Sequence, residues 1–302
     1  MKWIKSSRIS TLIIGLSIFQ LYFSGIIRHD KKEDDYINLA KQNQFDCVGQ
    51  VFKNNKESGS CVLISNKYIL TAAHILIEYD YEQEIVENNG QKMIFFNPKN
   101  PQPIESKNVK VLFMGKQYSV KTIYINPNHT DITKGNTNDI AIFELDTLIN
   151  GIQLPILNNK LNELNSKVIG VGYGVFGVAT NPKAMSLSKT KKIAGENTID
   201  TIVGYEINKS KAILTCDFDH PNKKEFNKFG SAIPRELEYL ATGGDSGGGL
   251  FRFKKNKWEL VGICASVKTD YGSFLSDGYY GGTMGWTRVS LFNQWINEVI
   301  NK

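Results

Sequence analysis

The sequence predicts an all-β protein made of two small antiparallel barrels and closed by one helix. Short runs of β-branched and aromatic residues, broken by Gly, Asn and Lys, are much commoner than helical patterns. The runs form two groups of about six, at residues 48–52, 61–65, 68–72, 109–114, 120–125 and 140–145, then at 168–172, 191–194, 212–217, 249–253, 260–267 and 285–289. Two such groups suit six-stranded barrels at about 45–155 and 156–302.

The closing helix is predicted over residues 290–301. Leu291, Trp295, Ile296 and Val299 recur there at helical spacing. Ser290 precedes them, and a serine hydroxyl can cap the first turn of a helix. The chain should therefore end on an amphipathic helix.

Two polar segments predict irregular structure. Residues 28–44 are charged and polar, which indicates a linker ahead of a domain at 45–302. Residues 78–107 are polar and contain Asn97-Pro98, Pro101 and Pro103. Proline interrupts regular pairing, so we expect a long surface loop there.

Residues 1–27 predict a signal peptide or a membrane anchor. Lys2, Lys5 and Arg8 precede an apolar run over residues 9–27, and charged residues follow. The run is close to the roughly 17–25 residues that span a bilayer. We favour a cleaved signal, cut after Ser24 or Gly25, over a retained anchor that would hold the protein on a membrane. Either interpretation places the body of the protein outside the cytoplasm, as a secreted or periplasmic/extracellular protein.

Four cysteines, Cys47, Cys61, Cys216 and Cys264, are compatible with two disulfides in an oxidising compartment. Pairing Cys47 with Cys61 and Cys216 with Cys264 keeps each bridge within one half of the chain. The sequence allows three pairings, and free buried thiols remain the alternative.

The charge pattern argues against nucleic-acid binding. The chain of 302 residues has a net charge of +6, but its lysines and arginines are scattered in short groups and form no long basic run. No Cys-x-x-Cys or His-rich spacing suggests a metal. We therefore expect no nucleic-acid partner, no metal and no cofactor.

Three short stretches carry the chemistry. They are Thr71-Ala72-Ala73-His74, Asn138-Asp139-Ile140-Ala141 and Gly244-Asp245-Ser246-Gly247-Gly248. A serine hydroxyl is a weak nucleophile that needs a base within reach, and the base needs an acceptor to fix its tautomer. The three stretches supply a His, an Asp and a Ser, and the glycines allow the tight turn that an oxyanion site requires.

The order of these residues excludes two other hydrolase types. Residues 244–248 also satisfy G-x-S-x-G, but an α/β-hydrolase places its His after the Ser. The four histidines, His29, His74, His129 and His220, all precede Ser246. Subtilisin order would need an Asp ahead of His74, and the nearest, Asp46, has no supporting context.

At the three stretches the chain resembles the trypsin/chymotrypsin-like serine proteases, whose motifs read TAAH, DIA and GDSGG. The resemblance covers nearly everything after residue 44, including Gly172-Tyr173-Gly174 and the closing segment from Gly285 to Val289. It implies a cleft between the barrels in which His74, Asp139 and Ser246 are catalytic. It also implies that the N–H groups of Gly244 and Ser246 form an oxyanion hole.

Asp139 has two rivals for the role of the acid. Asp131 and Asp146 lie in the same region, and Asp146 could be a turn or cap residue after a strand. Asp139 directly precedes the apolar run Ile140-Ala141-Ile142-Phe143, so it can be buried and orient an imidazole. We therefore assign it to the triad.

The chain departs from the trypsin pattern at the specificity pocket. Leu240 stands six positions before Ser246, where trypsin has its acidic pocket base. The resemblance implies a pocket lined by Leu240, Ala241, Ala265, Ser266 and Val267, with a weak preference for apolar side chains. Asp270 and Asp277, in loops near the expected pocket, are the acids that could reverse this preference.

The chain also departs from the family at the activation site. No Arg or Lys followed by Ile/Val-Val/Ile-Gly-Gly occurs near residue 45. In the zymogen type, an amine freed there pairs with the Asp before the catalytic Ser, here Asp245. We therefore hypothesise that family-style cleavage does not switch this protein on.

The resulting prediction is a secreted or envelope-associated serine endopeptidase whose partners are protein or peptide substrates. The alternative is a catalytically idle member of the same fold that serves as a binding module. Idle members normally lose a triad residue, and all three residues are present here.

Overall fold

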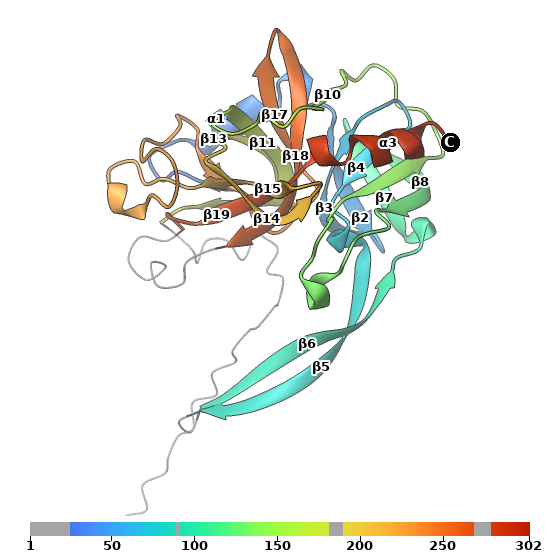
Figure 1. Ribbon diagram of the computed structural model, residues 1–302, viewed down its shortest axis with the longest axis horizontal. Coiled ribbons are helices and arrows are strands. Elements are labelled where there is room, and N and C mark those ends of the chain that lie inside the picture. Colours follow the sequence, from blue (N-terminus) through green and yellow to red (C-terminus); the bar gives the residue numbers. More distant parts are fainter. Residues whose placement is uncertain (1–24, 89–90, 181–189, 269–278) are drawn as a thin grey trace, which may run out of the picture.

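The computed structural model describes residues 25–88, 91–180, 190–268 and 279–302, and the chain is mostly β as predicted. The first half closes into a six-stranded barrel of strand order β2-β3-β4-β9-β8-β7 (Figure 1). Its strands are β2 (Val48–Lys53), β3 (Lys56–Leu63), β4 (Tyr68–Thr71), β7 (Val109–Phe113), β8 (Lys116–Ile125) and β9 (Ala141–Leu145). In β7 alternate residues Val109, Val111 and Phe113 are buried, which is the period-2 pattern of a strand that lines a core.

The second half forms a larger sheet than the expected six-stranded barrel. Eight strands take part, in the order β13-β11-β17-β18-β19-β15-β14, with β10 alongside β18. They are β10 (Ile156–Leu157), β11 (Lys167–Val175), β13 (Thr190–Thr198), β14 (Thr201–Ile207), β15 (Ser210–Asp217), β17 (Gly249–Lys254), β18 (Lys257–Lys268) and β19 (Thr283–Arg288). The hairpin of β14 and β15 supplies strand β14, which the sequence analysis left out.

The C-terminal helix forms as predicted, but its cap does not. Helix α3 (Asn293–Ile300) follows a short 3-10 turn, η7 (Val289–Leu291), and buries Ile296 and Val299 in the same core cluster as the first barrel. The Ser290 hydroxyl instead donates to Glu163 Oε1 at 2.7 Å. It binds this buried carboxylate because Glu163, also paired with Arg288, lies beside the start of the turn.

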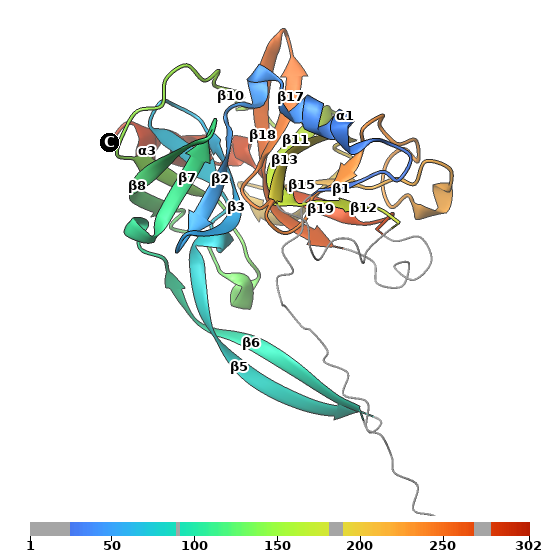
Figure 2. The same cartoon turned by 180° about the vertical axis from the view of Figure 1, so that it is seen from behind.

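Residues 28–44 are part of the fold, so the predicted linker is wrong. Helix α1 (Glu33–Ala40) and the turn η1 (Asn43–Phe45) pack on the second half (Figure 2). Tyr36 is fully buried and donates to the backbone oxygen of Glu238 at 2.9 Å. The segment looked like a linker because its buried residues are few and widely spaced among charges.

The predicted signal or anchor falls largely outside the described residues, which begin at 25. Ile26 and Ile27 nevertheless form a buried strand, β1, which pairs in parallel with β12 (Gly177–Val178) and antiparallel with β16 (Tyr239–Leu240). The last two residues of the predicted apolar segment therefore belong to the domain. Within the described ranges, no helix is long and apolar enough to cross a membrane.

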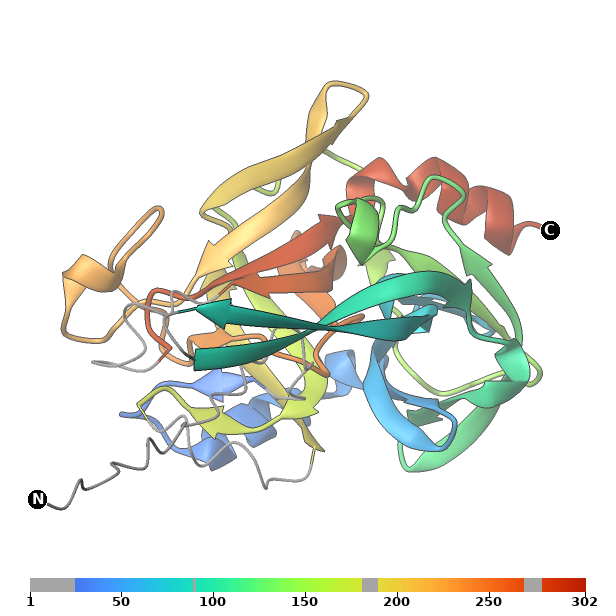
Figure 3. The same cartoon turned by 90° about the horizontal axis from the view of Figure 1, so that it is seen from below.

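The expected surface loop at 78–107 is instead a long hairpin. Strands β5 (Ile77–Asn88) and β6 (Gln91–Pro103) pair with each other and form a separate two-stranded sheet. Figures 1 and 2 show this hairpin projecting away from both sheets, and seen from below it lies in front of them (Figure 3). A short turn, η3 (Ser106–Asn108), then leads into β7.

All four cysteines are buried free thiols, so both proposed disulfides are wrong. In the pairing of β2 with β3, Cys61 lies opposite Gly49. Cys47 comes two residues before Gly49 in the chain, so the two thiols do not face each other across the hairpin. Cys216 and Cys264 lie on β15 and β18, which flank β19 on opposite sides. Two strand spacings amount to roughly 9.5 Å, beyond the reach of a disulfide.

Candidate active site

His74 is placed by the end of β4. Thr71, Ala72 and Ala73 are buried, and the chain turns into the short 3-10 helix η2 (His74–Leu76). The Thr71 hydroxyl donates to the backbone oxygen of Ser60 at 2.8 Å, which ties this turn to β3. The imidazole is therefore held on a rigid strand end at the edge of the first barrel.

Asp139 ends the loop between β8 and β9, which contains the turn η4 (Ile132–Lys134). Asn138 has a left-handed φ of 49° and its N–H donates to the Tyr205 hydroxyl at 2.6 Å. The Thr287 hydroxyl of β19 donates to the Asp139 backbone oxygen at 2.9 Å. Residues of the second half thus help to position the carboxylate of the first.

The two rival acids lie elsewhere. Asp131 accepts hydrogen bonds from the Thr133 N–H at 2.8 Å and the Thr133 hydroxyl at 2.6 Å, so it caps η4. Asp146 is exposed just after β9. Only Asp139 of the three contacts His74.

Ser246 lies in the turn that leads into β17. Gly244 and Gly247 have φ values of 95° and 87°, a region that favours glycine. A Cβ at Gly244 would also lie only 2.8 Å from the Gly174 Cα. The Ser60 N–H donates to the Ser246 backbone oxygen at 2.8 Å, so β3 of the first half fixes the turn.

The three predicted residues come together in one hydrogen-bonded chain. His74 Nε2 lies 3.0 Å from Ser246 Oγ, and His74 Nδ1 lies 2.7 Å from Asp139 Oδ2. The second carboxylate oxygen, Oδ1, accepts the His74 backbone N–H at 2.8 Å. Asp139 is 1% exposed, while Ser246 is only half-buried and stays within reach of a ligand.

The electrostatics of Asp139 are set by His74. Burial alone would raise the pKa of this carboxyl, but the neighbouring imidazole and its hydrogen bonds hold the pKa below the ordinary value. Asn136 Nδ2 adds a hydrogen bond to Oδ2 at 3.2 Å. The carboxylate therefore stays ionised and can stabilise a protonated imidazole.

The peptide N–H groups around Ser246 divide into two sets. Those of Asp245, Gly247 and Gly248 donate to the backbone oxygens of Thr242, Cys264 and Asp245. Among the described residues, the N–H groups of Gly244 and Ser246 have no such acceptor. These two are the donors that the sequence analysis assigned to an oxyanion hole.

Asp245 lies beneath the turn with an incomplete set of partners. It is 1% exposed, and its Oδ2 accepts the Thr242 N–H at 3.0 Å. Within the described part of the chain, Oδ1 has no hydrogen-bond partner. Burial raises the pKa of Asp245 to about 7, although the nearby backbone N–H groups of Thr242 and Gly174 lower it. Gly172 packs directly against the Asp245 carboxylate, so a residue with a Cβ at position 172 would collide with it.

The expected pocket residues lie on two neighbouring segments. Leu240 and Ala241 are fully buried, and Leu240 contacts Gly282 and pairs with Ile26 of β1. Ala265, Ser266 and Val267 lie on β18, at a bulge in its pairing with β19. Asp270 and Asp277 fall outside the described residues.

Ser60 is a site residue that the sequence analysis missed. Its hydroxyl donates to the Gly244 backbone oxygen at 2.8 Å and accepts the Tyr173 N–H at 2.7 Å. It therefore links β3, the turn before Ser246 and β11. Thr287 and Tyr205 were missed as well, since each meets its partner only through the fold. Asn136 was also missed, although it lies only three residues before Asp139. The available signals were this short spacing and the position of Ser60 in the stretch before His74.

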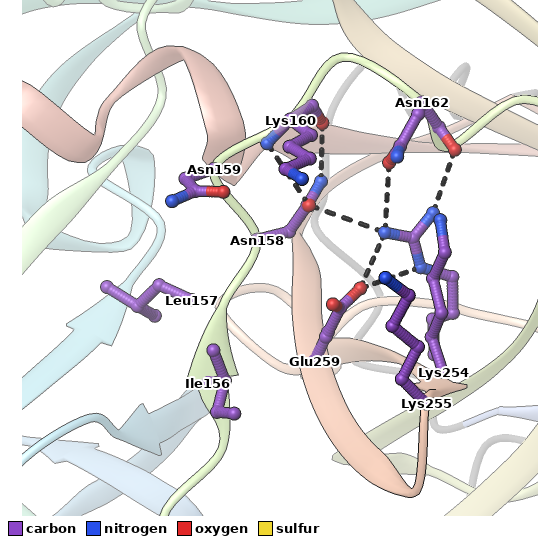
Figure 4. A pocket seen from close by; sticks show the side chains of 10 residues that line it. Ile156, Leu157, Asn158, Asn159, Lys160, Asn162, Lys254, Lys255 and Glu259 are labelled. Carbon is purple, nitrogen blue, oxygen red and sulfur yellow. Dashed lines mark hydrogen bonds and ion pairs between the residues drawn. The ribbon is translucent and has the colours of Figure 1, made fainter.

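A pocket between residues 156–162 and the β17–β18 hairpin lies apart from these residues (Figure 4). Its buried Arg252 binds Glu259 Oε2 at 2.6 Å, the Asn162 backbone oxygen at 2.8 Å and the Ser166 hydroxyl at 3.1 Å. These groups satisfy one another, so the pocket is a structural network that joins the loop to the sheet.

Compared with known protein families, the chain matches the family described as the trypsin-like peptidase domain over residues 59–263. The match spans more than half of the chain and includes all three residues of the hydrogen-bonded chain. The barrel, the C-terminal helix and the mostly β content agree with it. The chain therefore belongs to the trypsin-like peptidase domain family.

Proposed function

We propose that this peptidase is a serine-type endopeptidase in which His74, Asp139 and Ser246 form the catalytic triad. The observation that carries the proposal is the unbroken chain from Asp139 Oδ2 through the imidazole to Ser246 Oγ, with separations of 2.7 and 3.0 Å. A nucleophile, a base and an orienting acid within hydrogen-bond distance are what acyl transfer through serine requires.

The mechanism follows from the geometry. His74 Nε2 takes the Ser246 proton as Oγ attacks the scissile carbonyl carbon, and a tetrahedral intermediate forms. Asp139 accepts the Nδ1–H and stabilises the imidazolium. His74 then gives the proton to the leaving amine, which leaves an acyl-enzyme on Oγ. Water, deprotonated by the same imidazole, hydrolyses this ester and regenerates Ser246.

The N–H groups of Gly244 and Ser246 would stabilise the oxyanion. Among the described residues, neither N–H donates to a backbone oxygen, so both are available to a ligand, as such a role requires. The left-handed φ of Gly244 sets the direction of its peptide group. Losing one donor of this type typically costs roughly 10²–10³ in rate.

The fully buried Leu240 supports a preference for apolar side chains at the cleaved bond. Leu240 stands where trypsin has its acidic pocket base, so it supplies no charge to pair with a lysine or an arginine, and burying an unpaired charge is costly. Hydrolysis of peptide substrates that differ only at this residue would test the preference.

The N-terminal sequence supports action outside the cytoplasm, by a secreted protein or one anchored through residues 9–27. A cut after Ser24 or Gly25 would leave strand β1 in the fold. N-terminal sequencing of the exported protein would test both statements.

A fluorophosphonate probe tests the catalytic assignment. The protein should begin at Gly25, because β1 is buried in the domain. We expect labelling of this protein and none of Ser246→Ala. Well-folded protein that is not labelled, and that stays unlabelled after limited proteolysis, would instead favour the idle binding module.

A further inference from the structure

We propose that the β5–β6 hairpin, called here the arm, is an exosite that binds a basic and apolar segment of the protein substrate, C-terminal to the scissile bond. The inference rests on the proposed function. The arm starts at Ile77, three residues after His74. The Tyr79 hydroxyl accepts the Ile132 N–H at 3.5 Å, so the base of the arm contacts the loop that carries Asp139.

The position of the arm determines which part of the substrate it meets. His74 gives its proton to the leaving amine, so the segment after the scissile bond departs on the His74 side of the site. Twelve residues of strand make β5 about 40 Å long. An extended substrate could therefore contact the arm over roughly a dozen residues.

The arm has one mainly apolar face and an opposite face that carries its acids together with Val86 and Phe95. Register places Tyr81 opposite Pro98 and Ile85 opposite Ile94 on the same face, with the pair Gln83–Phe96 between them. Tyr81 and Ile85 are 53% and 59% exposed. A two-stranded hairpin is marginally stable by itself, and an exposed apolar face beside a catalytic site is typical of a binding surface.

The opposite face gives the arm its charge. Asn100 and Asn97 donate to Asp80 and Glu84 at 3.1 and 2.7 Å, and Lys99 pairs with Glu82. The amides are neutral, so this one ion pair leaves the acids of the face in excess. Strands β5 and β6 together carry five acidic residues and two lysines, a net charge of −3 in a chain of net +6. Charges on one thin strand pair act on both faces, within the Debye length of about 10 Å at 0.1 M salt. The charge therefore favours lysine and arginine in the bound segment.

Nested peptides test the exosite. One peptide ends two residues after a bond that the protein cleaves, and two others continue for about twelve residues of alternating Leu and Lys or alternating Leu and Glu. We expect kcat/KM for the Leu/Lys peptide to exceed that of the short one by about tenfold, with the advantage reduced by salt. Equal rates for the short and Leu/Lys peptides, or for the Lys and Glu extensions, would overturn the proposal.

Matched variants locate the effect on the arm. Tyr81→Thr/Ile85→Thr should remove the advantage of the Leu/Lys peptide, whereas Val86→Thr, on the opposite face, should keep it. Asp80→Asn/Glu84→Gln should reduce it, whereas Glu206→Gln on β14 should not. Fluorophosphonate labelling should be unchanged throughout. Failure of labelling in the well-folded parent protein, before and after limited proteolysis, would refute the proposed function, while normal labelling without length dependence would refute the exosite alone.

Discussion

Two aspartates of the site, Asp139 in the first half and Asp245 in the second, are equally buried but differ in their partners. Each is 1% exposed. Both oxygens of Asp139 accept hydrogen bonds from His74, and its pKa is lowered. Only one oxygen of Asp245 has a hydrogen-bond partner within the described residues, and its pKa is raised to about 7.

The difference teaches that burial does not decide the charge of a carboxyl group by itself. Burial raises the pKa of both groups, and at Asp139 the imidazole of His74, together with the hydrogen bonds from this residue, reverses that effect. Asp139, in the first half, therefore stays ionised beside the catalytic imidazole. Asp245, in the second half and directly before Ser246 in the chain, is a carboxyl that is partly protonated near neutral pH.

Ser246 Oγ of the second half is hydrogen-bonded to His74 of the first and is the proposed nucleophile, so its removal should have the largest effect. We expect Ser246→Ala to lower turnover by about six decades, as loss of the nucleophile does in other triads. Steady-state hydrolysis of a peptide substrate measures this. A loss under tenfold would contradict the assignment of the nucleophile.

Asp139→Asn should have the next largest effect. The amide can still occupy the site, but it cannot hold His74 in the required tautomer, so kcat should fall by about 10⁴. Asp131→Asn is the matched control, because Asp131 caps η4 and does not contact His74. Comparable losses in both variants would show that Asp139 acts through the fold of the loop alone.

The sequence predicted the triad because each residue lies in a short motif whose local context is informative. The separations among His74, Asp139 and Ser246 did not matter for that prediction. Thr287, by contrast, meets the Asp139 backbone 148 residues away, and no local pattern marks such a contact.

The errors in the sequence analysis have the same origin. The cysteine pairing failed because it depends on register and on the order β15-β19-β18, which are properties of the whole sheet. The arm was assigned as a loop because the stretch is polar and contains Asn97-Pro98, Pro101 and Pro103. The alternation of acids with apolar residues in β5 was the strand signal that this interpretation passed over. A free-standing hairpin can carry exposed acids along one strand, as β5 does, since neither face has to enter a core.

The two carboxyls should give opposite slopes of stability against pH. The pKa of Asp245 rises from about 3.9 unfolded to about 7 folded, so its contribution is complete below pH 4 and is lost as pH rises through 7. The difference corresponds to a loss of on the order of 4 kcal/mol. The pKa of Asp139 is lowered, so its contribution is present above the unfolded pKa and is lost as pH falls through the folded pKa.

Urea unfolding at pH 5 and pH 8 tests this contrast. Asp245→Asn should remove the stability loss between these pH values, whereas Asp139→Asn should not. The triad geometry keeps its ionised acid in the Asp245 variant, so we expect its activity to fall by less than about tenfold. A parent protein whose stability is equally pH-dependent with and without Asp245 would contradict the raised pKa.

The smallest expected effect concerns processing between residues 28 and 47. Helix α1 and Phe45 are packed, and Lys192 Nζ donates to the Phe45 backbone oxygen at 2.6 Å, so this segment already has its partners in the uncut chain. We expect protein with an intact 28–47 segment to be fully active, and a specific protease site inserted after Lys41 to give no gain in labelling rate when cut. Strict dependence on such a cut would mean that a freed amine is the partner that Asp245 Oδ1 lacks, and it would remove the contrast between the two carboxyls in the mature protein.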